Sequence, residues 1–175
     1  MTLKLKRTPG LYLLGFMASG KTTVGKVVAE SLGWCFADID QEVEREQGTK
    51  IAEIFDYHGE PRFRELECST LRRHVSRIET GQPWVLALGG GAILQATNWD
   101  LIQNNGVTIW LDCPLEIVRR RLGDDVTRPL ARDRTGLANL YEVRRPLYAR
   151  ADFRIEIDSD DISAAASRIL RLPIF

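Results

Sequence analysis

The sequence predicts an α/β fold in which helices cover both faces of a central parallel β-sheet. Short apolar runs typical of strands alternate with helical patterns along the chain, as expected for successive βαβ units. The run at 84–88 (WVLAL) is apolar throughout, which is typical of a strand buried on both faces. A chain of 175 residues with 44% hydrophobic residues suits one compact core, so we expect a single domain over residues 1–175.

Glycine and proline residues separate the expected elements of the N-terminal half. Gly33 lies where a helix-ending glycine is expected, and Gly48 and the turn at 59–61 interrupt the later helical patterns. The expected elements are strands at 12–14, 34–37 and 84–88, and helices at 21–32, 40–47, 51–57 and 62–77.

The C-terminal half continues the alternation, with one long interruption. Pro114 opens a helix, and Asp112 is expected to cap it. The segment at 123–136 is polar, charged and without periodicity, so we expect a long loop of the kind that usually has a function. The expected elements are strands at 107–111 and 153–157, and helices at 95–104, 115–122, 137–149 and 162–172.

Composition restricts the partners that the chain can have. Its formal net charge is zero, so no overall field attracts nucleic acid or an anionic membrane. Its three cysteines, Cys35, Cys68 and Cys113, form neither a zinc motif nor a disulfide framework, which indicates a reducing compartment. No apolar run approaches the roughly 18 residues of a membrane helix. We therefore expect a cytoplasmic protein without nucleic-acid or membrane partners, whose small size is compatible with a monomer.

The strongest motif is residues 15–22 (GFMASGKT), which fit the phosphate-binding loop G-x-x-x-x-G-K-[ST] between a strand and a helix. Gly15 and Gly20 let the backbone curl so that successive N–H groups point at a phosphate chain. The helix that follows adds the positive end of its dipole. Lys21 supplies a cation for the outer phosphates, and the Thr22 hydroxyl can ligate Mg²⁺. The loop predicts a nucleotide-binding protein.

Asp38 and Asp40 follow the second expected strand, at the sheet edge where ligands bind in doubly wound folds. Alternation along an extended segment would point both carboxylates the same way. One could hold Mg²⁺, directly or through water, while the other accepts a proton from a substrate hydroxyl. A strand-end turn with helix-capping aspartates explains the same pattern equally well, so the residues alone leave both interpretations open.

Several further signals are weak individually. Three glycines at 89–91 follow a buried strand, where a ligand can approach the backbone closely. Arg64 lies on an amphipathic helix, where a solvated face is the simplest interpretation. Arg128 lies in the long polar loop, which could close over a nucleotide, and Arg144 precedes a helix-disturbing proline.

Taken in order, these motifs resemble the shikimate kinase family over nearly the whole chain. Six motifs carry the resemblance: the loop at 15–23, Asp38-Ile39-Asp40, Gly59-Glu60 with Phe63, Arg64 and Glu67, GGGA at 89–92, RPL at 128–130, and Arg144 with PLY at 146–148 and Ala151-Asp152. The resemblance implies a P-loop NTPase-type three-layer sandwich with a five-stranded parallel sheet in the order 2-3-1-4-5. It also implies a mobile lid at about 123–136 and a shikimate-binding helical region at about 40–77.

For the donor, the resemblance implies ATP with Mg²⁺. Thr22 would ligate the metal and Asp38 would reach it through water, while Arg121 would pack against adenine. Arg128 would neutralise charge on the phosphoryl group in transfer. The residues implied to hold the ATP phosphates are Ala18, Ser19, Gly20, Lys21, Thr22 and Thr23.

For the acceptor, the resemblance implies shikimate, which is phosphorylated on its 3-hydroxyl as a step towards chorismate and the aromatic amino acids. Asp40 would bind the hydroxyls and act as general base. Arg64 and Arg144 would clamp the carboxylate, which planar guanidinium forks recognise with two hydrogen bonds. Gly90 would offer its backbone N–H, flanked by Gly89 and Gly91.

The sequence departs from the family pattern at a few positions. Ala18 stands where the family often has glycine, a change that the loop tolerates if the φ angle of Ala18 is negative. No arginine near Asp160 and Asp161 corresponds to the family's late adenine-loop arginine, which puts the adenine contacts there in doubt. The acidic pair at 124–125 adds negative charge before the lid.

Two other functions remain open at this stage. One is a related small-molecule kinase for gluconate or a nucleoside monophosphate, and the other is a ligand-sensing domain of the same family without turnover. The paired arginines and Asp40 favour an anionic polyol over the first alternative. Lys21, Asp38 and Arg128 are all present, which disfavours the second.

Overall fold

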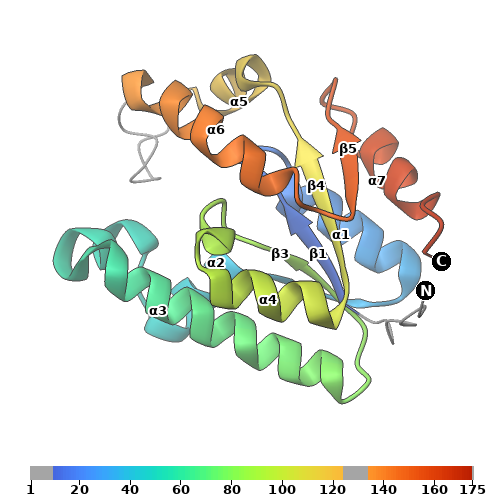
Figure 1. Ribbon diagram of the computed structural model, residues 1–175, viewed down its shortest axis with the longest axis horizontal. Coiled ribbons are helices and arrows are strands. Elements are labelled where there is room, and N and C mark those ends of the chain that lie inside the picture. Colours follow the sequence, from blue (N-terminus) through green and yellow to red (C-terminus); the bar gives the residue numbers. More distant parts are fainter. Residues whose placement is uncertain (1–9, 124–133, 175) are drawn as a thin grey trace.

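The computed structural model describes residues 10–123 and 134–174, and within these ranges the chain forms a three-layer α/β sandwich (Figure 1). Five parallel strands form one sheet in the order β2-β3-β1-β4-β5, which confirms the expected topology. The strands are β1 Gly10–Leu14, β2 Cys35–Asp38, β3 Trp84–Ala87, β4 Val107–Asp112 and β5 Phe153–Glu156.

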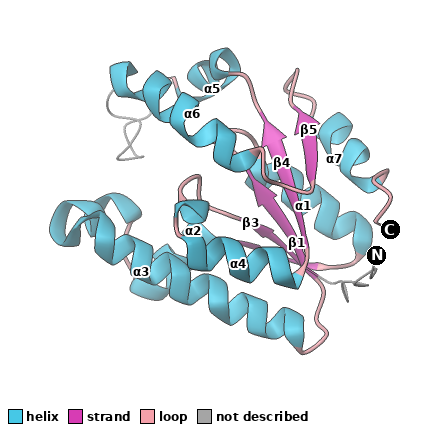
Figure 2. Cartoon of the chain, viewed as in Figure 1, coloured by secondary structure: helices cyan, strands magenta, loops and turns pink. Residues whose placement is uncertain are grey.

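Helices cover both faces of this sheet (Figure 2). Figure 1 shows α1 and α7 together on one side, and α3, α4 and α6 on the other. A short 3₁₀ turn at Ala92–Leu94 follows β3. The helices are α1 Lys21–Leu32, α2 Ile39–Gln47, α3 Ile51–Glu79, α4 Ala96–Asn105, α5 Leu115–Leu122, α6 Arg134–Tyr148 and α7 Ile162–Leu170.

Strand β1 lies at the centre of the sheet, between β3 and β4, and all five of its residues are buried. Its side chains Leu11, Tyr12, Leu13 and Leu14 are at most 1% exposed. The carboxyl end of this strand is therefore surrounded by the ends of its neighbours, and the loops that follow these strands meet at one edge. Figure 1 shows this edge between α6 and α2.

Three local expectations need correction or refinement. Asp112 does not cap α5, whose N-cap is Pro114 without a side-chain hydrogen bond, because two arginines bind the Asp112 carboxylate instead. Helix α6 begins at Arg134, so the last residues of the segment expected as lid are helical. The interruption at 59–61 narrows to Gly59, whose φ of 79° and ψ of 168° kink α3 between two helical parts.

Arg128 and most of the segment expected as lid lie outside the described residues. Within the two described ranges, no helix is long and apolar enough to span a membrane.

Gly25 permits the close approach of α1 to the sheet. A Cβ atom there would lie 2.6 Å from Cε2 of Phe36 and 3.0 Å from Cδ1 of Leu13. We predict that Gly25→Ala lowers the free energy of unfolding by about 1–2 kcal/mol, because overpacking outweighs the gain in helix propensity. Chemical denaturation of Gly25→Ala, Phe36→Leu and the double variant provides the measurement. Gly25→Ala should cost clearly less in the Phe36→Leu background, and equal costs in both backgrounds would refute the steric explanation.

Candidate active site

The loop after β1 has the backbone of a phosphate-binding site. Gly15 has a φ of 145°, and a Cβ there would lie 2.7 Å from the carbonyl oxygen of Leu111 on β4. Gly20 has a φ of 95° and leads directly into α1. Only glycine adopts these angles without strain, so the two glycines of the motif fix the loop at the N-terminus of α1, where N–H groups and the helix dipole attract anions.

Ala18 carries the strain in this loop. We expected an alanine to be tolerated here if its φ angle were negative, but its φ is 58°, in the left-handed region. This conformation costs a non-glycine residue roughly 1–2 kcal/mol. The carbonyl oxygen of Ala18 accepts a hydrogen bond of 3.0 Å from Nη1 of Arg121, which helps to hold the strained residue in place.

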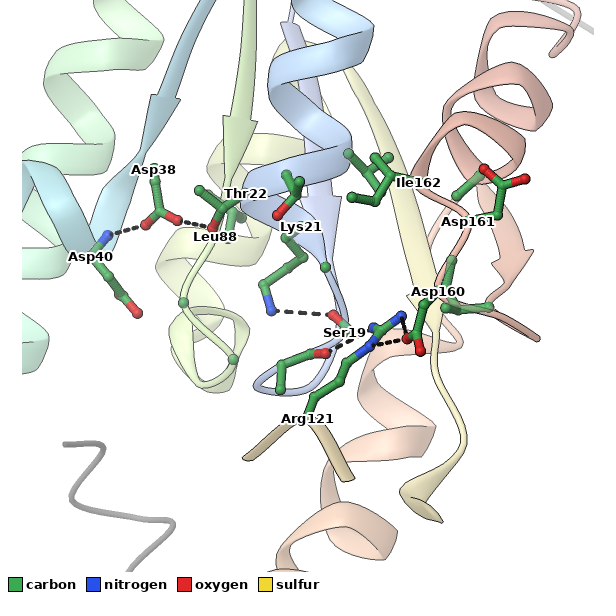
Figure 3. A pocket seen from close by; sticks show the side chains of 18 of the residues that line it. Ser19, Lys21, Thr22, Asp38, Asp40, Leu88, Arg121, Asp160, Asp161 and Ile162 are labelled. Carbon is green, nitrogen blue, oxygen red and sulfur yellow. Dashed lines mark hydrogen bonds and ion pairs between the residues drawn. The ribbon is translucent and has the colours of Figure 1, made fainter. Parts of the chain in front are cut away.

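The Lys21 ammonium lies inside the curve of the loop. Its Nζ donates to the carbonyl oxygens of Gly15 and Phe16, at 2.9 and 2.8 Å, and approaches Oγ of Ser19 at 3.4 Å (Figure 3). A cation is thereby held inside a loop of the kind whose backbone amides bind phosphate. The structure thus brings Lys21 and Ser19, two of the expected phosphate-binding residues, close to each other.

Asp38 links the loop to the next strand. One carboxylate oxygen accepts a hydrogen bond from the Thr22 hydroxyl, and the other accepts from the backbone N–H groups of Asp40 and Gln41, at 3.0 and 3.3 Å (Figure 3). Asp38 therefore caps α2, as the structural interpretation predicts, and its second oxygen also contacts Thr22 at the start of α1. Its contact with Thr22 places a hydroxyl and a carboxylate side by side.

This oxygen pair fits a hard divalent cation. Mg²⁺ prefers oxygen ligands, and in phosphotransferases it is usually held by one or two protein groups plus substrate phosphates. Among the residues that the structure describes, no group of three histidine, cysteine or acidic residues could hold a metal by itself. Thr22 and Asp38 are the candidates, with the nucleotide completing the coordination.

A cavity of about 360 Å³ joins the phosphate loop to Asp40. Figure 3 shows Lys21, Thr22, Asp38 and Asp40 around it from one side, and Arg121 and Asp160 from the other. The cavity is lined by residues 18–24, Asp38, Asp40, residues 88–90, Arg121, Ile157 and residues 159–162 with Ala165. All six expected phosphate contacts therefore surround one space that also contains the expected base.

Arg121 lies at the far end of this cavity and is held by the loop before α7. Its Nε donates to Asp160 at 2.9 Å, and its Nη2 donates to the Ser159 carbonyl oxygen at 3.2 Å. Arg120 also pairs with Asp160, at 2.7 Å. The sequence left the adenine contacts near residues 160–161 in doubt because no arginine stands there. The structure shows that Asp160 of this segment instead binds Arg121, 39 residues away in the chain.

Arg64 is not on a solvated face. Its side chain is only 12% exposed, and its guanidinium donates to Glu67 at 2.8 Å and to Glu60 at 2.9 and 3.1 Å. A Cβ atom added at Gly91 would collide with this guanidinium. Because Gly91 has no side chain, the Arg64 guanidinium can pack against the loop that follows β3.

Glu67 was part of the motif match, yet sequence reasoning assigned no role to it. It is fully buried on α3, and a Cβ at Gly89 would lie 2.5 Å from both Oε1 of Glu67 and Oδ1 of Asp40. The two carboxyl groups therefore face the same point. Burial raises the pKa of Glu67 to about 7; Arg64 opposes this rise, and Asp40 adds to it. The spacing of three residues from Arg64 on a helix was the available signal.

Arg144 approaches the same glycines from α6. Its side chain is buried, and a Cβ at Gly90 would lie 3.5 Å from its Nη1. The Tyr148 hydroxyl donates to the Gly90 carbonyl oxygen, one turn further along α6. Burial lowers the pKa of Arg144, and the nearby positive charge of Arg64 acts in the same direction. Among the described residues, no carboxylate forms an ion pair with Arg144, so two guanidinium groups converge here on a place suited to an anion.

These features define a P-loop kinase for a small anionic acceptor. The phosphate loop and Asp40 line one cavity, and Glu67, Arg64 and Arg144 lie beside the glycines that follow β3. The sequence model described as "Shikimate kinase" matches residues 17–172, and the chain belongs to the shikimate kinase family. It is therefore a phosphotransferase of the family that uses ATP and shikimate.

Curated relatives and solved structures agree with this assignment. A shikimate kinase from Persephonella marina is 43% identical over 161 residues, which are 91% of this chain and 96% of the relative. One from Synechococcus elongatus is 42% identical over 166 residues, 93% of this chain and 85% of the relative. The structure of a shikimate kinase from Acinetobacter baumannii in complex with shikimate matches with a TM-score of 0.89 and 38% identity, covering 95% of this chain and 93% of that one.

The pKa of Glu67 predicts how stability depends on pH. The folded state retains the proton up to about pH 7, whereas a free glutamate releases it near 4.5. The stabilisation from this proton is complete below the lower value and is lost as pH rises through 7, with a slope of up to about 1.4 kcal/mol per pH unit. We predict that Glu67→Gln abolishes this decline, measured by urea denaturation between about pH 4.5 and 8. The exposed neighbour Glu65→Gln is the control and should keep the wild-type slope. A slope unchanged in Glu67→Gln would show that Glu67 is ionised throughout this range.

Proposed function

We propose that the chain transfers the γ-phosphate of ATP, with Mg²⁺, to the 3-hydroxyl of shikimate, giving shikimate 3-phosphate and ADP. The observation that carries this proposal is the single cavity that contains both the phosphate loop and Asp40. Donor and acceptor sites that open into one space allow direct in-line transfer, which requires positioning and charge neutralisation more than covalent chemistry by the protein.

On the donor side, the backbone of residues 18–23 and the N-terminus of α1 bind the phosphates. Lys21 exchanges its contacts with two loop carbonyls for contacts with the outer phosphates. Thr22 and Asp38 hold Mg²⁺, which neutralises charge on the phosphates when it is bound. Arg121, kept in place by Asp160, packs against the adenine.

On the acceptor side, Asp40 accepts the proton of the 3-hydroxyl as its oxygen forms a bond to the γ-phosphorus. The bond from that phosphorus to the bridging oxygen of ADP breaks in the same step. Arg64 and Arg144 bind the shikimate carboxylate, which gives Arg144 a direct ion-pair partner in addition to the more distant charge of Glu60. Gly89 and Gly91 keep the backbone close to the substrate, because a side chain at Gly89 would displace Asp40 and Glu67 and one at Gly91 would displace Arg64. Gly90 lies between them and offers its backbone N–H.

Other features of the proposal rest on the sequence and its resemblance. Residues 123–136 act as a lid, from which Arg128 neutralises the phosphoryl group, and residues 40–77 form the shikimate-binding region of a single domain. We expect a cytoplasmic monomer, in keeping with the three free cysteines, of which Cys35 is exposed and Cys113 buried.

An acceptor panel tests the proposed function directly. ADP release is followed in a coupled assay with ATP and Mg²⁺, using shikimate, quinate, gluconate and the nucleoside monophosphates. We predict turnover with shikimate far above the blank without acceptor. Release with shikimate no greater than the blank would refute the proposal. A preference for gluconate or a nucleotide would indicate the related kinases instead.

The role of Asp40 is tested by Asp40→Asn. Loss of the base should lower kcat by about 10²- to 10⁴-fold while ATP affinity stays near that of wild type, because general-base catalysis acts in the transition state. Steady-state kinetics and equilibrium titration with a fluorescent ATP analogue measure the two quantities. Asp100→Asn, at an exposed position on α4, is the matched control and should be silent. An equal loss of ATP binding would assign Asp40 to the nucleotide rather than to the hydroxyl.

A further inference from the structure

Asp112 is a buried carboxylate that none of the proposed catalytic steps uses. It lies at the carboxyl end of β4 and is 5% exposed. Arg145 donates to its Oδ2 from Nη2 at 2.9 Å, and Arg154 donates to the same oxygen from Nε at 2.8 Å and from Nη2 at 2.7 Å. A buried carboxylate is stable only when paired in this way, so the two arginines are structurally required partners.

Both arginines also cover Trp110, which precedes Asp112 by two residues on the same face of β4. The centre of the Arg145 guanidinium lies 5.6 Å from the Trp110 ring centroid, and that of Arg154 lies 5.2 Å from it. Trp110 and Asp112 thus form one aromatic and anionic platform, which we call the Trp110–Asp112 platform. Its two arginines lie at similar distances from the Trp110 ring, but Arg154 contacts Asp112 through two nitrogen atoms and Arg145 through one.

The two arginines differ in what they connect. Arg154 lies on β5, directly opposite Trp110 in the sheet, so it joins two strands that already pair through their backbones. Arg145 lies on α6 and joins this helix to the sheet. It is also the neighbour of Arg144, the buried arginine beside Gly90. A link between α6 and the sheet therefore adjoins the expected carboxylate clamp.

This link supports a helix that carries a buried charge. Burial lowers the pKa of Arg144 and the charge of Arg64 acts in the same direction, whereas Tyr148 and Glu60 oppose this shift. The position of Arg144 relative to these groups depends on where the last turns of α6 lie. Arg145 of this helix is held by the carboxylate of Asp112. Two tyrosines on either side of it also bind the sheet region. The Tyr141 hydroxyl donates to the Cys113 carbonyl oxygen at 3.1 Å, and the Tyr148 hydroxyl donates to the Gly90 carbonyl oxygen. Three contacts with different partners thus fix the helix where Arg144 must be placed.

We propose that Asp112 and Arg145 are positioning residues for shikimate binding, because their ion pair holds α6 in the position from which Arg144 can bind the shikimate carboxylate. The proposal rests on the proposed function, which assigns the carboxylate to Arg144. Binding groups lose much of their effect when displaced by as little as about 1 Å, so the loss of the anchor should be measurable in substrate affinity.

The matched variants Arg145→Gln and Arg154→Gln test the proposal. Each removes one guanidinium from the Trp110–Asp112 platform and leaves the other. Both should lower the unfolding temperature, and Arg154→Gln at least as much as Arg145→Gln, because Arg154 makes more contacts. Arg145→Gln should raise the KM for shikimate about five- to tenfold and leave the KM for ATP within about twofold of wild type. Arg154→Gln should leave both constants within about twofold of wild type. Arg145→Lys, which retains a charge that can reach Asp112, should recover part of the shikimate affinity.

A double-variant cycle separates positioning from a general effect on the fold. In an Arg144→Met background, Arg145→Gln should add little further increase in the KM for shikimate, because the residue through which it acts is gone. Independent, multiplicative increases in KM would overturn the proposal. Equal increases in KM for Arg145→Gln and Arg154→Gln would also overturn it, as would an unchanged KM in Arg145→Gln. Failure of the wild-type protein to phosphorylate shikimate would instead refute the proposed function, so the two failures are distinguishable.

Discussion

The carboxylate of Asp38 joins the two halves of the site, and the rest of the arrangement depends on it. One oxygen binds the Thr22 hydroxyl at the start of α1, and the other binds the first backbone N–H groups of α2. The nucleotide-binding helix and the helix that carries Asp40 are thereby held by the same side chain. Strands β2 and β1 do not pair with each other, because β3 lies between them in the sheet. The Asp38 carboxylate therefore joins the residues that follow these two strands, which no backbone hydrogen bonds of the sheet connect.

The acceptor side is organised around the cost of burying charge. Arg64, Glu67 and Asp40 lie together beneath the glycines at 89–91, and Glu67 has no exposed surface. The positive charge of Arg64 partly offsets the two carboxyl groups, and the raised pKa of Glu67 lets it retain a proton near neutral pH. A neutral Glu67 leaves more of the Arg64 charge available to an anionic substrate. The same group that orients the arginine therefore influences how strongly it attracts the carboxylate.

Helix α6 contributes the opposite side of the clamp, and its position is less constrained by the sheet than those of the strands. Its contacts with Asp112, Cys113 and Gly90 are made by Arg145, Tyr141 and Tyr148, of which only Tyr148 belongs to an expected motif. Arg144 is desolvated and faces a second positive charge, so it needs both a rigid support and an anionic ligand. Substrate binding and helix docking are coupled at this point.

The sequence alone was sufficient for the phosphate loop and for the resemblance to a family, because these depend on local patterns and on motifs whose spacing is rigid. The strand order followed from that resemblance and not from the local patterns. Gly15, Gly20 and Lys21 lie close to one another in the chain, and their backbone requirements can be inferred directly from residue types.

Contacts between distant segments could not be inferred in this way. Asp112 was expected to cap the adjacent helix, a local interaction, but arginines 33 and 42 residues away compete successfully for its carboxylate. The same limit applied to Glu67 facing Asp40 and to Asp160 holding Arg121. Residue type and spacing determined which groups the site contains. Only the tertiary structure decided which of them share a buried space, because the pairing of buried charges is determined by proximity in the folded chain and not by distance along it.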